Sequence, residues 1–141
     1  ARRANSSSAF RFPPRSQGIV GVSVSSMHET GIATGLLQLI REELSRRGNL
    51  RCLAARVEVG ELSGVSPEAL SFAFEHLAPS HGLAGTRLTI VPVPGRVKCG
   101  ACGQEGDFPR ETWRCLHCQG GPLEVLQGKE MDLRELEVEE K

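Results

Sequence analysis

Four cysteines in the order Cys-x2-Cys-x12-Cys-x2-Cys constrain the fold of this chain more than any other feature. They are Cys99, Cys102, Cys115 and Cys118. Two short Cys-x-x-Cys knuckles can place four thiolates at the corners of a tetrahedron, which is the geometry that Zn(II) adopts in structural sites. The spacing therefore predicts a single metal site built from two knuckles. Because four cysteines leave no open coordination position, the zinc is expected to be structural rather than catalytic.

The same array has three other interpretations: two redox dithiols, two disulfides, or a mononuclear iron site. The total of 5 cysteines is odd, and neither pair lies in a thioredoxin-like unit, so dithiols and disulfides are disfavoured. Iron would use the same four sulfurs and would be recognised by its colour. The fifth cysteine, Cys52, is expected to be a small buried apolar residue in a strand.

The segment that carries the array, residues 96–122, is expected to form a zinc-binding module. It is too short to build a hydrophobic core, so the metal must supply much of its folding free energy. His117 lies between the last two cysteines. It is interpreted either as a solvent-facing residue of the knuckle or as a ligand that replaces a cysteine when the site reorganises.

Charge is balanced over the chain but unevenly distributed along it. The 17 basic and 17 acidic residues cancel, yet residues 1–26 contain arginines and no acid. Within the module the two signs nearly cancel, which disfavours a nucleic-acid surface. No apolar run approaches the ~20 residues that a membrane-spanning helix needs. We therefore expect a cytoplasmic protein that binds neither nucleic acid nor membrane.

Residues 1–26 differ from the remainder in composition. They are rich in serine, proline and arginine and show no helical or strand period before the apolar residues at 19–22. This composition indicates a disordered leader, or an extension that is not in the working protein. It is also typical of a transit peptide. Met27 stands where regular patterning begins.

Two helices are expected after Met27. Apolar residues recur at helical spacing, and Arg46, Arg47 and Gly48 end the first helix. The second helix begins with Ser66 as its N-cap and is stopped by Pro79. The apolar face of the first helix consists of Ile32, Leu36, Leu39, Ile40 and Leu44.

Three strands accompany these helices. Alternating apolar and charged residues predict one from Leu53 to about Leu62 and another from Thr86 to Val93. After the module, two short alternations are out of phase by one residue, and a bulge near Arg134 would reconcile them. The expected fold is α+β: a small sheet of three to four strands with two helices, and an inserted zinc-ribbon-like module at 96–122. Residues 27–95 and 123–141 form the main domain.

Three segments together resemble one protein family. They are Met27-His28-Glu29 at the start of the first helix, the 57–62 strand that ends in Gly60-Glu61-Leu62, and the late cysteine array. In combination they are similar to the HypA/HybF family of hydrogenase nickel-incorporation proteins, over residues 27–140. The cysteine array alone occurs in many zinc proteins, whereas its combination with Met-His-Glu is narrow. The resemblance implies a metallochaperone that delivers Ni(II) to the large subunit of [NiFe] hydrogenase.

The resemblance also implies a nickel site at Met27, His28 and Glu29. Its donors would be the Met27 amine, the backbone amides of His28 and Glu29, and the His28 imidazole, a set that suits square-planar Ni(II). In this sequence Ser26 precedes Met27, so the Met27 nitrogen is an amide. The four-nitrogen site is complete only in a chain that starts at Met27.

Further implications of the resemblance concern partners. A HypB-type GTPase and the hydrogenase large subunit are expected, and the protein itself is expected to be a monomer or a weak homodimer rather than an enzyme. The alternative is a zinc-ribbon adaptor that binds nucleic acid or protein. Such an adaptor requires a basic face with exposed aromatic residues, and Phe108 and Trp113 are the aromatic residues that the module offers.

Overall fold

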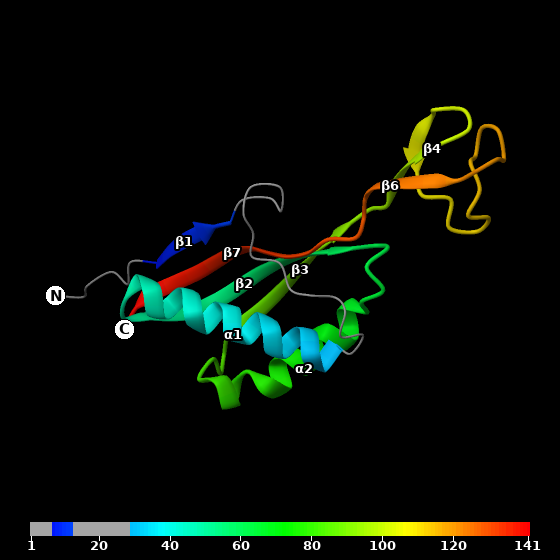
Figure 1. Cartoon of the computed structure of the whole chain (residues 1–141). Helices are drawn as coiled ribbons and strands as arrows, with labels where there is room; N and C mark the ends of the chain where they lie inside the picture. Colours follow the sequence, from blue (N-terminus) through cyan, green and yellow to red (C-terminus); the bar gives the residue numbers. More distant parts are fainter. Residues whose placement is uncertain (1–6, 13–28) are drawn as a thin grey trace.

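A computed structural model of the chain describes residues 7–12 and 29–141. It contains a four-stranded sheet in the order β1-β7-β2-β3 and a three-stranded sheet in the order β5-β4-β6. Both helices cover one face of the larger sheet, and the smaller sheet projects from one end of it (Figure 1). The predicted α+β fold with an inserted module is confirmed. Within the described residues, no helix is long and apolar enough to cross a membrane.

The two helices form where the sequence predicts them. Helix α1 spans Glu29–Arg47. Helix α2 spans Pro67–Leu77, and the side chain of Ser66 accepts a hydrogen bond from the Ala69 N–H at 3.3 Å, which confirms the predicted N-cap. A short 3-10 helix follows at Pro79–His81. The most buried stripe of α1 contains Leu37, whereas Leu39, placed on the apolar face by the spacing, is only partly buried.

The core lies between these helices and the strands β2, β3 and β7. Strand β2 (Leu50–Gly60) runs parallel to β3 (Arg87–Val93) and antiparallel to β7 (Met131–Glu140). Arg56 pairs with Glu135 but Val57 pairs with Leu133, so Arg134 is the extra residue of a bulge. The predicted bulge is confirmed. It lets both apolar alternations of β7 face the helices: Met131, Leu133, Leu136 and Val138 are all buried.

Residues 7–12 contradict the expectation of a disordered leader. Strand β1 (Ser7–Arg11) pairs antiparallel with β7, and the Phe12 N–H donates to the Arg134 carbonyl at 2.8 Å. The physical reason is that β7 would otherwise expose its unpaired backbone groups along one edge. Phe10 packs against the core and Phe12 is part of it. The apolar run at 19–22 lies outside the described residues.

The module is longer than its predicted range of 96–122. It consists of β4 (Arg96–Cys99), β5 (Glu105–Asp107) and β6 (Leu123–Gln127). Strand β6 pairs with β4, so residues 123–127 belong to the smaller sheet and not, as the sequence predicts, to the main domain. The apolar alternation of β6 is too short to show from the sequence which sheet it joins. The main domain resumes at β7.

Candidate metal centre

The first knuckle of the module follows strand β4. Cys99 is the last residue of that strand, and its sulfur faces the backbone N–H groups of Ala101 and Cys102 at 3.3 and 3.5 Å. Gly103 closes the loop at a φ of 75°, where a side chain would be strained. Backbone N–H groups that point at a sulfur stabilise its thiolate form. This loop therefore prepares Cys99 to act as a metal ligand.

The second knuckle repeats this geometry around Cys115. Its sulfur faces the N–H groups of His117 and Cys118 at 3.4 and 3.5 Å. Gln119 turns the chain with a φ of 59°, and its N–H donates to the Cys115 carbonyl at 2.9 Å. Each pair thus consists of one buried cysteine, Cys99 or Cys115, followed by an exposed one.

The two knuckles bring all four sulfurs into one cluster. Every Sγ lies within 4.8 Å of the others, with Cys99 to Cys118 at 3.6 Å and Cys102 to Cys115 at 3.5 Å. A tetrahedral site with Zn–S bonds of about 2.3 Å has sulfur-to-sulfur edges of about 3.8 Å. The arrangement therefore fits one tetrahedral cation. Within the described residues no other group of ligating side chains meets this criterion.

The acidities of the thiols show why this cluster suits a cation. Backbone hydrogen bonds from Cys118 and His117 lower the pKa of Cys115 to about 6. Cys102 accepts a backbone hydrogen bond from Gln104, but partial desolvation of its sulfur and the neighbouring cysteines outweigh it and raise its pKa to about 12. Four thiolates this close repel one another, so they cannot all ionise together without a positive charge among them. A dication supplies that charge and would hold all four sulfurs as thiolates.

The other histidines of the described residues, and Cys52, lie outside this cluster. His117 is exposed on the second knuckle, as its solvent-facing interpretation expects. His76 stacks on Phe72 with ring centroids 6.3 Å apart, and the Nδ1 atom of His81 lies 3.1 Å from the Leu77 carbonyl. Cys52 is buried in β2, and burial raises the pKa of its thiol to about 11, so the prediction of an apolar core cysteine is confirmed.

The segment Met27-His28-Glu29 is described only at its last residue. Met27 and His28 lie outside the described residues. Glu29 is the first residue of α1, and its carboxylate accepts a hydrogen bond from the Ser66 N–H at 3.2 Å. This contact holds the beginning of α1 beside the N-cap of α2.

A close junction connects the main domain to the module. A Cβ atom on Gly60 would lie 2.0 Å from the Gly128 carbonyl oxygen, and one on Gly128 would lie 2.8 Å from the Gly95 Cα. Only glycine fits at such separations. At the same place the Glu61 carboxylate accepts a hydrogen bond from the Gly95 N–H at 2.9 Å and forms an ion pair with Arg110 of the module. Sequence reasoning missed this role of Glu61.

The Glu61 carboxyl is shifted in acidity by this junction. The hydrogen bond from Arg110, and then the one from the Gly95 backbone, lower its pKa below the ordinary value. The three glycines were the available signal, because Gly60 ends β2, Gly95 directly precedes β4 and Gly128 directly follows β6. Without the structure, nothing indicates that they meet.

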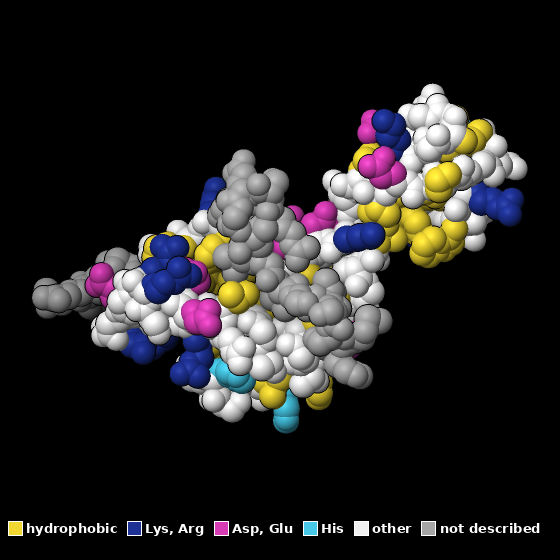
Figure 2. Space-filling model, in the orientation of Figure 1, with side chains coloured by type: hydrophobic (Ala, Val, Ile, Leu, Met, Phe, Trp, Pro, Cys, Tyr) yellow, Lys and Arg dark blue, Asp and Glu magenta, His cyan; other side chains and the backbone are white. Residues whose placement is uncertain are grey.

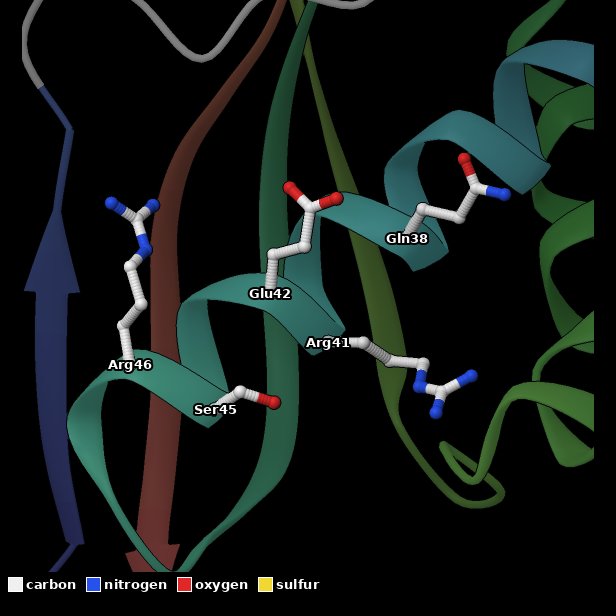
Figure 3. A pocket seen from close by; sticks show the side chains of 5 residues that line it. All are labelled: Gln38, Arg41, Glu42, Ser45 and Arg46. Atoms are coloured by element: carbon white, nitrogen blue, oxygen red, sulfur yellow. The ribbon is translucent and has the colours of Figure 1, made fainter.

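A surface hollow on α1 shows no catalytic arrangement. Figure 3 shows its side chains diverging from one face of the helix, without converging on a common point. A solvated helix face explains this pattern. The lining residues are Gln38, Arg41, Glu42, Ser45 and Arg46.

The module surface combines charged and apolar side chains. On the face drawn in Figure 2, acidic, basic and hydrophobic side chains are intermingled over the module. Arg96 and Asp107 form an ion pair at 2.8 Å. Trp113 is 68% exposed and meets Phe108 edge to face at 4.7 Å between ring centroids. The drawn face therefore lacks the uniformly basic surface that a nucleic-acid adaptor requires.

Comparison with known proteins identifies the family to which the main domain and the module belong. The family described as "Hydrogenase/urease nickel incorporation, metallochaperone, hypA" matches residues 27–138. The chain belongs to the HypA family. Hydrogenase maturation factor HypA 2 of Bradyrhizobium diazoefficiens is 37% identical over 113 residues, which are 80% of this chain and all of that protein. The HypA of Geobacter metallireducens is 38% identical over 115 residues, with the same coverage of both chains.

Two solved HypA structures share the fold. The solution structure of the Ni metallochaperone HypA from Helicobacter pylori has a TM-score of 0.56 at 24% identity, covering 81% of this chain and 97% of that one. A second structure, described as the solution structure of HypA protein, has a TM-score of 0.59 at 25% identity, with coverage of 80% and 97%. The HypA match begins at Met27, so β1 lies outside it.

Proposed function

We propose that this protein is a nickel carrier that binds Ni(II) as cargo at Met27, His28 and Glu29 and delivers it to [NiFe] hydrogenase during maturation of the enzyme's metal centre. The observation that carries the proposal is the HypA match over residues 27–138, which begins at the Met27 of the Met-His-Glu segment. The family description names both hydrogenase and urease, and the relatives compared above are hydrogenase maturation factors. Hydrogenase is therefore the proposed recipient.

The donor chemistry supports a carrier. An N-terminal amine, two deprotonated amides and an imidazole would form fused chelate rings around a square-planar Ni(II) ion. Because deprotonation of backbone amides is costly near neutral pH, affinity should depend on pH and the metal should exchange. Exchange suits delivery better than storage. In this proposal residues 27–95 and 128–141 form the nickel-binding domain.

The cysteine cluster has a separate role in this proposal. Zn(II) held by Cys99, Cys102, Cys115 and Cys118 would stabilise the fold of the module, because four thiolates leave no position for a substrate. The remaining features follow the family resemblance. We propose a cytoplasmic, non-enzymatic monomer or weak homodimer that works with a HypB-type GTPase and with the hydrogenase large subunit.

A deletion experiment tests the proposed function. In the organism that encodes this protein, loss of the gene should leave hydrogenase inactive and its large subunit without nickel, and excess nickel in the medium should partly restore activity. Urease activity, where the organism has it, is measured in parallel. Fully active, nickel-loaded hydrogenase in the deletion strain would refute the proposal. Normal hydrogenase with inactive urease would change the recipient to urease.

The N-terminus decides the expected coordination of nickel. A chain that starts at Met27 should bind Ni(II) as a diamagnetic planar complex with a visible absorption band, because an amine and two amides impose a strong ligand field. The full 141-residue chain should bind more weakly and give a paramagnetic, six-coordinate spectrum, since its Met27 nitrogen is an amide. Absorption spectroscopy and calorimetry on the two chains provide the measurement. Identical spectra and affinities would show that the Met27 nitrogen is not a ligand.

A further inference from the structure

The outer edge of β7 is occupied by a segment from outside the HypA match. Strand β1 pairs with it in a continuous register from Ser7 opposite Glu139 to Arg11 opposite Glu135. The Phe12 N–H extends the pairing by donating to the Arg134 carbonyl at 2.8 Å. Because the strand order is β1-β7-β2-β3, β7 would be an edge strand without β1. Residues 7–12 therefore complete the sheet.

The two phenylalanines of this segment face the core. Residues two apart on a strand share a face, so Phe10 and Phe12 point the same way. Phe12 is 7% exposed and belongs to the core cluster. The guanidinium of Arg47, at the end of α1, lies 3.9 Å from the centroid of the Phe10 ring, and its Nε atom also lies 3.4 Å from the Glu43 carboxylate. The segment thus contacts a side chain that is held in place by the helix.

The charges on the face of the sheet opposite the core explain why residues 7–12 fit beside β7. Arg11 lies on that face, with its Nε atom 3.3 Å from the Glu135 carboxylate. A second copy of β7 at this edge would bring two strongly acidic strands together, which is unfavourable. Strand β1 contains one arginine and no acidic residue, so it avoids this repulsion. The acidic residues of β7 are Asp132, Glu135, Glu137, Glu139 and Glu140.

We propose that the outer edge of β7 is a docking site for a short extended segment that carries two phenylalanines on one face and an arginine on the other. Residues 7–12 fill this site in cis. The main-chain bonds provide β-strand addition, while the core face and Glu135 provide specificity. The same segment supplied in trans binds only when the resident strand is displaced. This proposal does not depend on the nickel function.

Displacing β1 from the edge of β7 in the full chain tests whether residues 7–12 fill the site in cis. Replacing both phenylalanines, F10S and F12S, removes the apolar anchors of β1. The amide hydrogens of β7 that point toward β1 should then exchange at least about tenfold faster, while those that join β2 to β3 keep their rates. F72S is the matched control. It makes the same change from phenylalanine to serine on α2, away from the β7 edge, at a residue that is 73% exposed. R11E is a milder variant that leaves both phenylalanines in place and sets like charges at Glu135.

A peptide of residues 6–13 tests whether the same segment binds in trans. It should bind the F10S/F12S chain one to one and restore slow exchange in β7, but should not bind the wild-type chain. A peptide in which serine replaces both phenylalanines should bind at least about tenfold more weakly. Unchanged exchange of β7 in both the F10S/F12S and R11E chains would overturn the proposal. So would absence of peptide binding to an opened edge, or a dimer of the opened chain in which β7 is again protected.

Discussion

Replacing His28 with alanine should abolish stoichiometric Ni(II) binding while the zinc content stays unchanged. The imidazole is the one side-chain nitrogen in the proposed donor set, and the proposed zinc site uses other ligands far along the chain. We expect the affinity for nickel to fall by at least tenfold, which corresponds to about 1.4 kcal/mol or more. Calorimetry with Ni(II) and elemental analysis of the purified protein measure the two quantities together.

Three other histidines provide matched controls for this result. His76, His81 and His117 each have an imidazole and lie outside the proposed nickel site. Their alanine variants should bind nickel as the wild-type chain does. Undiminished affinity in the His28 variant would place the metal elsewhere, and a loss in one of the controls would identify where.

Replacing Cys99 or Cys115 with alanine should release the zinc and unfold the module. These two residues are the buried cysteines of the cluster. Their sulfurs accept hydrogen bonds from backbone N–H groups of the two knuckles. Structural zinc contributes about 10–16 kcal/mol in small zinc-binding peptides, far more than the few apolar contacts of this module could replace. Helix α1 and strand β2 should stay folded, because their core lies in the main domain. Metal analysis and residue-resolved hydrogen exchange measure both effects.

Cys52 is the control for the cysteine substitutions. It is buried in β2, away from the cluster, so Cys52→Ala should retain one zinc per chain although it leaves a small cavity. Full metal retention in both the Cys99 and the Cys115 variants would show that the cluster is not the zinc site. Loss of the main-domain fold in those variants would show that the module and the main domain do not fold independently.

Features that depend on neighbouring residues could be predicted from the sequence. The N-cap at Ser66 needs only the residues that follow it, and the bulge at Arg134 is visible as a change of phase within one strand. The meeting of the four cysteines was predictable for a different reason. The spacing within each pair fixes a knuckle, and four sulfurs that share one cation must meet wherever the chain places them.

Contacts between distant segments could not be predicted in this way. Phe10 and Phe12 lie in a serine-rich, basic stretch that resembles disorder, and their partners in β7 are more than 120 positions away. The ion pair between Glu61 and Arg110 joins residues 49 apart. Neither local period nor composition carries information about such pairings. Resemblance to a family did not help with β1, because the family match begins after it.

The junction at Gly60, Gly95 and Gly128 has a consequence for how the module relates to the main domain. Arg96 pairs with Gln127, so the chain leaves the module beside the point where it entered. The module is therefore a side branch attached at its base to the path from β3 to β7, the two strands that flank β2. Loops within that branch can lengthen or shorten without changing the spacing of the strands below it. The close packing of the three glycines and the contacts of Glu61 with Gly95 and Arg110 are thus where the module constrains the main domain.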